Sequence, residues 1–341
     1  MNQKILSRGK LLNVYGNLDE AGYAKSLVKE YRRSDIQASP WRIKEWDYYY
    51  IGCGEFGIAL TIADNSYMGL GSVSLLDFKN KTFITKSEMK FFTFGRTNLP
   101  PTSKVGDVSF KGKKVTIDFL NNGVKRTLKC HFKNFSDKID FDCEIDVFDE
   151  PQESMVIATP FDKKKHFYYN QKINCMRAKG KATFGGKVYN INPDECFAVL
   201  DWGRGVWTYK NTWYWSSMSG LINGKKIGFN LGYGFGDTSK ATENMIFYDG
   251  LAYKTEEVTF RIPQKDGKDD FMSPWKFTSN DGAIELDFVP IVNRRDNTNL
   301  LVLKSNQNQV FGLFSGTLKF QDKVVEIKDQ IGFAEKVTNL W

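Results

Sequence analysis

Histidine is scarce in this sequence, and its scarcity limits the metal chemistry that the protein can support. Among 341 residues only His131 and His166 are histidines, and there is no H-E-x-x-H motif or Cys-His cluster. Zinc sites are usually built from such clusters, so we expect no metal. The motifs G-x-S-x-G and G-x-x-x-x-G-K-S/T are also absent. Their absence argues against a serine hydrolase of the usual kind and a P-loop enzyme.

Cysteine is sparse and irregularly spaced. There are five cysteines and no C-x-x-C motif. This pattern favours reduced thiols in a cytosol over a disulfide framework. The N-terminal stretch MNQKILSRGKLLNVYG lacks the continuous apolar core of a signal peptide, and no stretch approaches the roughly 20 apolar residues that span a bilayer. We therefore expect a soluble, cytoplasmic protein without a membrane span.

Positive charge is in excess but is not concentrated. The net charge is +8, yet lysine and arginine are spread along the whole chain. The densest runs, at residues 111–114 and 163–165, are short and fall where turns are expected. We interpret them as solvated loop tips rather than a phosphate-binding patch, and we expect no nucleic-acid partner. Nucleic-acid binding through phosphates would weaken steeply with salt, which provides its test.

Aromatic residues are abundant and favour β-structure. The sequence is 15% aromatic and contains 29 glycines. From Trp41 onward, alternating apolar runs and turn clusters recur about every ten to twelve residues, as in all-β sandwiches and barrels. Roughly twenty strands or more suit two antiparallel, lipocalin-like barrels of about eight to ten strands each. The only helix that we predict covers residues 18–33.

The predicted boundary between the two barrels lies near residues 150–165. An acidic turn, two prolines and a lysine run interrupt the strand pattern there. We therefore expect an N-terminal barrel over residues 1–160 and a C-terminal barrel over residues 161–341. Strands are predicted at 168–178 and 180–189, among others. No short repeat is visible, which argues against a propeller or a solenoid.

One glycine motif suggests a nucleotide site. Gly52, Gly54 and Gly57 have the G-x-G-x-x-G spacing, and Asp77 follows twenty residues beyond the last glycine. The motif binds a pyrophosphate only where the glycines open a helix. Residues 58–62 instead alternate like a strand. We predict two antiparallel strands over residues 50–78, with Asp77 closing the second, and we expect no nucleotide cofactor.

The segment 201–216 contains the richest cluster of aromatic residues. If residues 210–212 form a hairpin turn, strand alternation places Trp207, Trp213 and Trp215 on one face with Asp201. The aromatic rings then either fill a barrel core or form the wall of a ligand cavity, with Asp201 or Arg204 as the polar fixing point. The sequence alone leaves both interpretations open.

Asp201 has two alternative roles, one structural and one catalytic. We predict an ion pair between Asp201 and Arg204, made possible by a bulge at Gly203 and Gly205. Without that pair, an isolated carboxylate in an aromatic cavity would be protonated near neutral pH and could act as a general acid.

Other polar residues join the candidate set. His166 and Asn170 share a strand face, where His166 is either a satisfied structural residue or a general base. Glu243 follows a glycine-rich stretch at residues 232–239 and is either a buried carboxylate or a solvated loop acid. The full set of candidate ligand-binding residues is Asp201, Arg204, Trp207, Trp213, Trp215, His166, Asn170 and Glu243.

Three segments together carry a family resemblance. The motif D-W-G-R-G-x-W followed by W-x-W, with KEWDYY at 44–49 and HFYYNQK at 166–172, resembles the bacterial family called domain of unknown function 2804 over nearly the whole chain. That family looks related to the lipocalin-like two-barrel group that includes carotenoid hydratases of the hydroxyneurosporene synthase type and fungal Diels–Alderases. The resemblance implies two calycin-like barrels and a hydrophobic pocket, and it transfers no catalytic motif.

Two functions follow as hypotheses. The first is a binding module that holds a small hydrophobic or isoprenoid-like molecule against the tryptophans. The alternative is a hydratase, isomerase or cyclase in which Asp201, Glu243 or His166 transfers a proton to or from an apolar substrate. A carboxylate inside the aromatic pocket would favour the alternative. The ligand, the barrel that holds it and the oligomeric state are left open.

Overall fold

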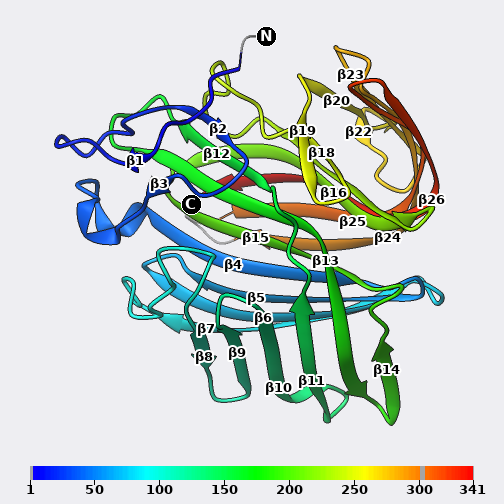
Figure 1. Ribbon diagram of the computed structural model, residues 1–341. Coiled ribbons are helices and arrows are strands. Elements are labelled where there is room, and N and C mark those ends of the chain that lie inside the picture. The colour runs from blue at the N-terminus through cyan, green and yellow to red at the C-terminus, as the bar shows by residue number, and fades with distance from the viewer. Residues whose placement is uncertain (1–2, 300–303, 341) are drawn as a thin grey trace.

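The computed structural model describes residues 3–299 and 304–340 and consists almost entirely of β-strands (Figure 1). In these residues the helices are two single 3-10 turns, η1 (Arg33–Asp35) and η2 (Pro40–Arg42). None of the described helices is long and apolar enough to cross a membrane. The prediction of an all-β fold with two lipocalin-like antiparallel barrels is confirmed, and the barrels take the form of two curled sheets.

The helix predicted over residues 18–33 is wrong. That segment contains β2 (Gly22–Ala24) and β3 (Lys29–Glu30), which pair with β12 (Met155–Pro160) and β1 (Gly9–Lys10). It has no continuous apolar stripe with which a helix could pack. Backbone pairing with neighbouring strands therefore satisfies its amides and carbonyls.

The first curled sheet has thirteen strands, with the main order β7-β6-β5-β4-β15-β13-β11-β10-β9-β8. Besides β2 and β12, its strands are β4 (Ile43–Gly52), β5 (Phe56–Asp64), β6 (Met68–Asp77), β7 (Thr82–Phe91), β8 (Val108–Lys111), β9 (Val115–Asn121), β10 (Arg126–Ser136), β11 (Ile139–Phe148), β13 (Phe167–Phe184), β14 (Lys187–Ile191) and β15 (Phe197–Val206). Phe110 of β8 packs over Gly71 of β6, so the sheet curls around its own core.

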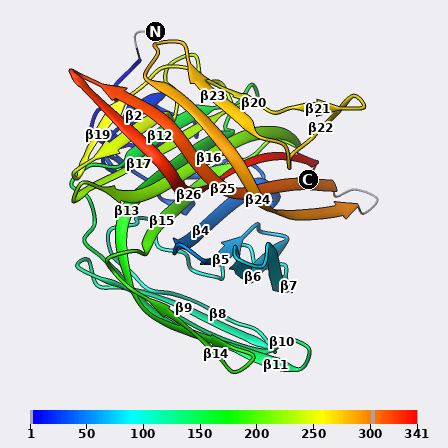
Figure 2. The ribbon, with the colours of Figure 1, turned by 90° about the vertical axis from the view of Figure 1, so that its right-hand side faces the viewer.

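The second curled sheet has nine strands in the order β19-β18-β17-β16-β26-β25-β24-β23-β20. They are β16 (Lys210–Ile222), β17 (Lys225–Tyr233), β18 (Met245–Tyr248), β19 (Leu251–Lys254), β20 (Val258–Arg261), β23 (Trp275–Ser279), β24 (Ile284–Asn299), β25 (Lys304–Phe320) and β26 (Lys323–Leu340). The rings of Tyr233 and Phe260 lie 5.2 Å apart and join β17 to β20 across the curl. A short hairpin, β21 (Gln264–Lys265) and β22 (Lys268–Asp269), extends from this sheet (Figure 2).

The change from the first sheet to the second lies at residues 207–209. β13 is one long strand with a bulge between Ile173 and Met176, so the two strands predicted at 168–178 and 180–189 are merged. The turn falls at Gly185 and Gly186, both with positive φ, instead of at Lys179. β12 ends at Pro160 and pairs with β13, which begins at Phe167. Strands on both sides of the predicted boundary therefore belong to the first sheet. The division into domains at that residue stays a prediction.

The antiparallel hairpin predicted within residues 50–78 is present as β5 and β6, and the glycine motif at residues 52–57 lies at the preceding turn between β4 and β5. Gly52 ends β4 and pairs with Gly57 of β5, and β5 pairs antiparallel with β6, which ends at Asp77. No helix begins between residues 54 and 57. The positive helix end that a pyrophosphate requires is therefore missing at this motif.

The expectation that all cysteines are reduced thiols is wrong for two of them. Cys53 and Cys196 form a disulfide, whereas Cys130, Cys143 and Cys175 are free and buried. The bonded cysteines adjoin the paired ends of β4 and β15, where Gly52 lies opposite Phe197. This neighbourhood is hidden in the sequence because the two cysteines are 143 positions apart. A cytoplasmic location stays a prediction, now without the support of reduced thiols.

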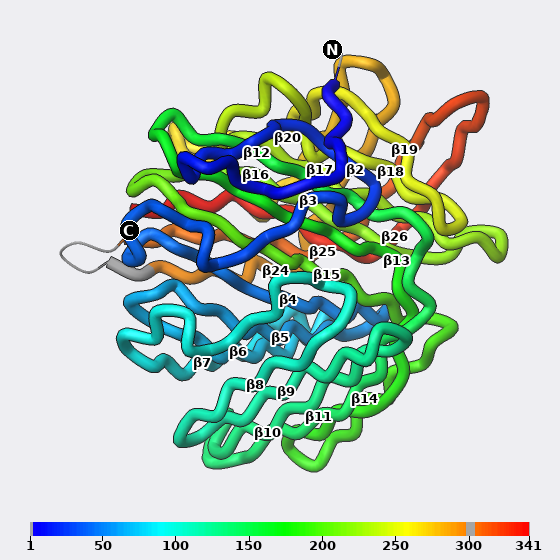
Figure 3. The backbone as a smooth tube through the Cα atoms, turned by 60° about the vertical axis from the view of Figure 1, so that its left-hand side comes forward, coloured from blue at the N-terminus to red at the C-terminus, as the bar shows by residue number. Residues whose placement is uncertain are grey.

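The strands β4 and β15 and the first part of β13, residues 167–176, are buried on both faces and lie at the contact between the two sheets. On β4, Tyr49 and Ile51 belong to the core of the first sheet, whereas Tyr48 and Tyr50 pack with Trp215 against the second sheet. In Figure 3, β4 and β15 run between β24 and β25 on one side and β5 and β6 on the other. Alternate residues of one strand therefore serve two different environments.

Candidate functional site

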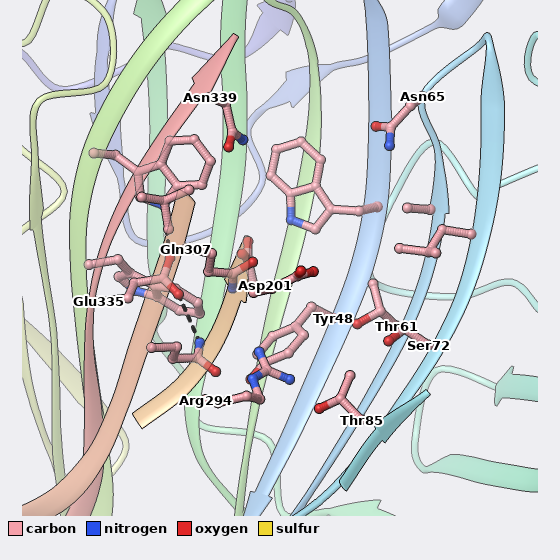
Figure 4. Close-up of a pocket in the computed structure, with 18 of the residues that line it drawn as sticks. Tyr48, Thr61, Asn65, Ser72, Thr85, Asp201, Arg294, Gln307, Glu335 and Asn339 are labelled. Carbon is pink, nitrogen blue, oxygen red and sulfur yellow. Dashed lines mark hydrogen bonds between the residues drawn. The ribbon is translucent and has the colours of Figure 1, made fainter. Parts of the chain in front are cut away.

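A cavity of about 510 Å³ lies between the two sheets (Figure 4). Its volume is within the range of small-molecule pockets, about 300 to 1,000 Å³. Strands β4, β5, β6, β7, β13 and β15 supply one wall, and β16, β24, β25 and β26 supply the other. The exposed residues Arg295 and Asp296 also line the cavity, which opens to solvent beside them.

The first wall is organised by a row of residues across neighbouring strands. Lys172 of β13 lies opposite Asp201 of β15, which lies opposite Tyr48 of β4. The row continues to Thr61 of β5 and Ser72 of β6. We call these five residues the first-sheet row. Directly opposite residues approach closely, and Lys172 Nζ indeed lies 2.7 Å from Asp201 Oδ1.

The second wall contains a matching row. Trp215 of β16 lies opposite Glu335 of β26, which lies opposite Gln309 of β25, which lies opposite Arg294 of β24. We call these four residues the second-sheet row. Glu335 is held from both sides, because Trp213 Nε1 donates to Oε1 at 2.8 Å and Gln309 Nε2 donates to Oε2 at 2.9 Å.

The two rows face each other across the cavity. Lys172 Nζ lies 3.9 Å from the ring centroid of Trp215, and the Arg294 guanidinium carbon lies 6.0 Å from that of Tyr48. Figure 4 shows Asp201, Glu335 and Arg294 directed into the same space. The stacking of two cross-strand rows therefore concentrates charged groups in a largely buried volume.

Aromatic residues line the cavity beside these rows. We call Trp46, Tyr168, Trp207, Trp213 and Phe235 the aromatic cluster. The centroid of Trp207 lies 5.3 Å from that of Trp46, 5.8 Å from that of Trp213 and 4.8 Å from that of Phe235. Gly203 of β15 makes this possible, because a Cβ there would lie 1.9 Å from the indole of Trp46. A larger residue at 203 would displace that ring.

Two carboxyl groups in the cavity have raised pKa values. Burial raises the pKa of Glu335 to about 7, against the hydrogen bond from Trp213 and the charges of Arg294 and Lys172. Burial also raises the pKa of Glu243, which the charge of Lys172 opposes. Glu243 packs over Gly232, where a Cβ would lie 2.6 Å from its Oε1. Both groups can therefore hold a proton nearer neutral pH than an exposed glutamate does.

The structure brings together five of the eight residues predicted from the sequence. Asp201, Trp207, Trp213, Trp215 and Glu243 all line the cavity. The hairpin predicted to align the tryptophans is wrong, however, because β15 and β16 belong to different sheets and β16 pairs with β17 and β26. The indoles meet because the chain crosses between sheets at residues 207–209. Trp207 and Trp215 are buried, and Trp213 is half-buried.

The predicted ion pair between Asp201 and Arg204 is also wrong. Arg204 lies on the other face of β15 and pairs with Asp47 at 2.9 Å. The partner of Asp201 is Lys172, and Asn170 Nδ2 donates to the same carboxylate oxygen at 2.6 Å. No bulge interrupts β15 between residues 201 and 204, so strand alternation keeps the two residues on opposite faces.

His166 and Asn170 do not line the cavity, and their ligand-binding roles stay predictions. His166 is buried in the turn before β13, where its Nδ1 lies 2.9 Å from the carbonyl of Lys164. Burial lowers its pKa. Asn170 is linked to the cavity indirectly, because it donates a hydrogen bond to Asp201, which lines the cavity. No cluster of three metal-ligating side chains occurs within residues 3–299 and 304–340.

Sequence reasoning missed several cavity residues. Lys172, Trp46 and Tyr48 lie inside the segments 44–49 and 166–172 that carry the family resemblance, so those segments contained a signal for them. For Glu335, Gln309 and Arg294 the sequence contained no such signal. Their strands are distant in sequence from the tryptophans, and only the register of the second sheet places them together.

Comparison with known proteins agrees with the fold. The chain shares 12% identity and a TM-score of 0.51 with the crystal structure of an AttH-like protein from Nitrosomonas europaea, covering 92% of this chain and 97% of that one. Kievitone hydratase from Nectria haematococca shares 12% identity and a TM-score of 0.47 with this chain, covering 99% of this chain and 98% of that one. CghA shares 11% identity and a TM-score of 0.43, covering 97% of each chain. At 12% identity the AttH-like structure shows a shared fold and nothing more, and the other two similarities are weaker still.

The resemblance found in the Trp-rich motif is confirmed at the level of the family. The sequence has no detectable relative among curated proteins. The family model described as domain of unknown function (DUF2804) matches residues 2–341, and the lipocalin-like fold expected from the hydroxyneurosporene synthase-type group is present. The chain therefore belongs to the family of domain of unknown function 2804.

Proposed function

We propose that the protein binds a small molecule with a ring-bearing or otherwise apolar body in the cavity between its sheets. The observation that carries this proposal is the aromatic cluster, which borders about 510 Å³ that the chain's own side chains leave unfilled. Aromatic faces stabilise rings and apolar chains by burial and by edge-to-face contacts. The hydrophobic or isoprenoid-like ligand expected from the sequence suits such a wall.

Two features support binding over simple packing. Trp207 is buried, and its indole N–H has no acceptor among the described residues. A buried donor without a partner costs free energy unless a ligand or water satisfies it. The interiors of the two curled sheets, in contrast, are filled by their own apolar side chains. The space between the sheets is therefore the place where a ligand can be buried at least cost.

A variant that fills the cavity tests this function. Thr61 is half-buried in the first wall, and Thr61→Trp adds an indole to the cavity. We expect native mass spectrometry of protein purified from its own host to show a co-purifying small molecule, and we expect Thr61→Trp to lose it. The matched control is Val188→Trp on β14, where the side chain is 52% exposed outside the cavity. Equal retention by both folded variants would contradict binding in the cavity.

A second candidate function is proton transfer to or from the bound molecule, as in a hydratase, isomerase or cyclase. The observation that favours it is Glu335, a buried carboxyl group in an aromatic wall with hydrogen bonds from Trp213 and Gln309. With a pKa of about 7, it is partly protonated at neutral pH. Such a group can donate a proton to a substrate carbon or oxygen and accept it back.

The co-purifying molecule provides the test of catalysis. Incubation with the protein in D₂O should add deuterium to a carbon of that molecule, or should add water to it, as seen by mass spectrometry. Glu335→Gln should abolish the change while the molecule still binds. Unchanged exchange in Glu335→Gln would contradict the role of Glu335, and binding without any exchange would leave the binding function alone standing.

A further inference from the structure

Arg294 is the member of the second-sheet row whose charge is not balanced by the protein. Its Nη1 donates to Ser74 Oγ at 2.7 Å, and its guanidinium carbon lies 6.0 Å from the ring centroids of Tyr48 and Phe311. No carboxylate within the described residues lies at ion-pair distance from it. A guanidinium offers five N–H donors. Among the described residues, only Ser74 accepts a hydrogen bond from Arg294, and it does so from Nη1.

The other charges around the cavity offset the charge of Arg294 only in part. Lys172 and Asp201 pair with each other at 2.7 Å. Burial raises the pKa of Glu335 and of Glu243, which favours their uncharged forms. Arginine stays protonated under all ordinary conditions. Arg295 and Asp296 carry opposite charges and are exposed where the cavity opens. The half-buried Arg294 therefore adds a positive charge to the cavity wall for which the described residues provide no ion-pair partner.

The surroundings of Arg294 are polar where the rest of the cavity is aromatic. Across from it, the first-sheet row continues beyond Tyr48 to the hydroxyl groups of Thr61 and Ser72. Figure 4 shows both hydroxyl-bearing residues on the wall that faces Arg294. Hydroxyl groups can donate hydrogen bonds to an oxyanion. This end of the cavity thus combines one guanidinium with donors on the opposite strand pair.

We propose that Arg294 binds an oxyanion, such as a carboxylate or a sulfonate, carried by the apolar molecule that the cavity holds. This inference rests on the binding function proposed above and adds the class of ligand, an amphipathic acid. Trp46 and Tyr48 are two residues apart on one face of β4, a separation of roughly 7 Å. A molecule whose rings contact the aromatic cluster at Trp46 therefore reaches Arg294 within the same cavity. The planar guanidinium fork matches the two oxygens of such a group.

A pair of fluorescent probes separates charge recognition from apolar binding. 1-Anilinonaphthalene-8-sulfonate and N-phenyl-1-naphthylamine share their ring systems, but only the first carries a sulfonate. Both are titrated into the full chain and into the variants Arg294→Gln and Arg294→Lys. The control is Arg261→Gln, which removes an exposed positive charge from β20 of the same sheet. Binding in the cavity is defined for each probe by its loss in Thr61→Trp.

We expect Arg294→Gln to weaken binding of the sulfonate probe by about tenfold to a hundredfold, the range that hydrogen bonds to charged groups contribute. Binding of the neutral probe should change less than about twofold, because burial of its rings is unaltered. Arg294→Lys should fall between wild type and Arg294→Gln for the sulfonate, since it keeps the charge but loses the fork. Arg261→Gln should leave both probes unchanged.

Two results would overturn the inference, and they are distinguishable. If both probes bind in the cavity and Arg294→Gln weakens them equally or not at all, the anion site is wrong while the binding function stands. If neither probe binds wild type at a site that Thr61→Trp blocks, the proposed binding function fails and the anion site fails with it. Circular dichroism of each variant confirms that the comparison uses folded protein.

Discussion

The two faces of β15 carry two buried ion pairs with different surroundings. On the face toward the core of the first sheet, Arg204 lies 2.9 Å from Asp47 and donates to the carbonyls of Trp46, Gly203 and Pro100 at 2.7 to 2.8 Å. On the face toward the cavity, Lys172 has Asp201 and the ring of Trp215 as its neighbours.

The difference separates a structural role from a binding role. The guanidinium of Arg204 is fully buried, and main-chain carbonyls accept from both of its Nη atoms, whereas its Nε has no acceptor among the described residues. Beside the cavity, the indole N–H of Trp207 and the charge of Arg294 remain unmatched by the described residues. Unpartnered polar atoms occur on both faces, since Arg204 Nε also lacks an acceptor in the described part of the chain. The two faces differ in access, because Trp207 and Arg294 line a cavity whereas Arg204 is enclosed by the core.

Breaking the ion pair on the closed face should have the largest effect. Arg204→Gln removes the partner of Asp47, whose carboxylate is buried and whose pKa burial already raises. We expect a loss of about 3 to 5 kcal/mol in the free energy of unfolding, typical of a buried pair that loses one member. Urea denaturation measures it, with Arg261→Gln as the exposed control. A loss below about 1 kcal/mol would contradict the structural role, since surface changes have effects of that size.

The cavity face should respond to pH through Glu335. Its pKa is about 7 in the folded protein against an ordinary value of 4.5. The folded state keeps a proton that the unfolded chain releases, so this stabilisation is complete below pH 4.5 and is lost as the pH rises through 7. The loss amounts to about 3 kcal/mol at most. Glu335→Gln should lack it.

Unfolding of wild type and Glu335→Gln at several pH values measures this difference. The stability of the variant relative to wild type should rise between pH 4.5 and pH 7 and stay level above. A difference that is independent of pH would mean that Glu335 titrates like an exposed residue. Glu326, which lies on β26 outside the cavity, provides the matched control as Glu326→Gln.

Breaking the ion pair on the cavity face should cost less than breaking the one on the closed face. Asp201→Asn leaves Lys172 without its carboxylate, but water in the cavity can solvate the freed ammonium. We expect a loss of about 1 to 3 kcal/mol, the penalty for an unpaired polar group with partial compensation. Denaturation under the same conditions as for Arg204→Gln gives the comparison. A loss equal to that of Arg204→Gln would remove the distinction between the two faces.

The smallest effect is expected at Gly54, in the turn after β4 and away from both faces. No atom lies within 4 Å of a Cβ built on Gly54, and its φ is not in the left-handed region. Gly54→Ala should change the free energy of unfolding by no more than about 0.5 kcal/mol. Thermal denaturation measures it. A larger loss would show that another part of the chain approaches Gly54 too closely to leave room for a Cβ atom.

Strands β5 and β15 show which features of the fold could be predicted from the sequence and which could not. Alternation over residues 58–62 correctly predicted β5 and excluded a nucleotide turn at Gly54. The same rule placed Arg204 and Asp201 on opposite faces, which is what the structure shows, and the ion pair that we expected between them needed a bulge that does not occur. The tryptophan hairpin was wrong because residues 210–218 pair with β26 instead of folding back on β15.

Glu335 illustrates what remained beyond prediction. It contacts Trp213 at a separation of 122 positions, and nothing near it in sequence indicates that contact. Lys172 was within a segment of recognised resemblance, but its partner follows from the register of β13 with β15. Register between distant strands depends on turns, bulges and packing along the whole sheet, so a local pattern cannot specify it.

The sequence by itself determined the all-β character and which residues of a strand share a face, because side-chain alternation with a period of two is a local property of the backbone. The tertiary structure alone decided which faces meet. The first-sheet row opposes the second-sheet row because two curled sheets pack against each other, which brings Lys172 over Trp215 and Arg294 beside Tyr48. The cavity exists because the curved surfaces of these sheets leave space between them that their side chains do not fill.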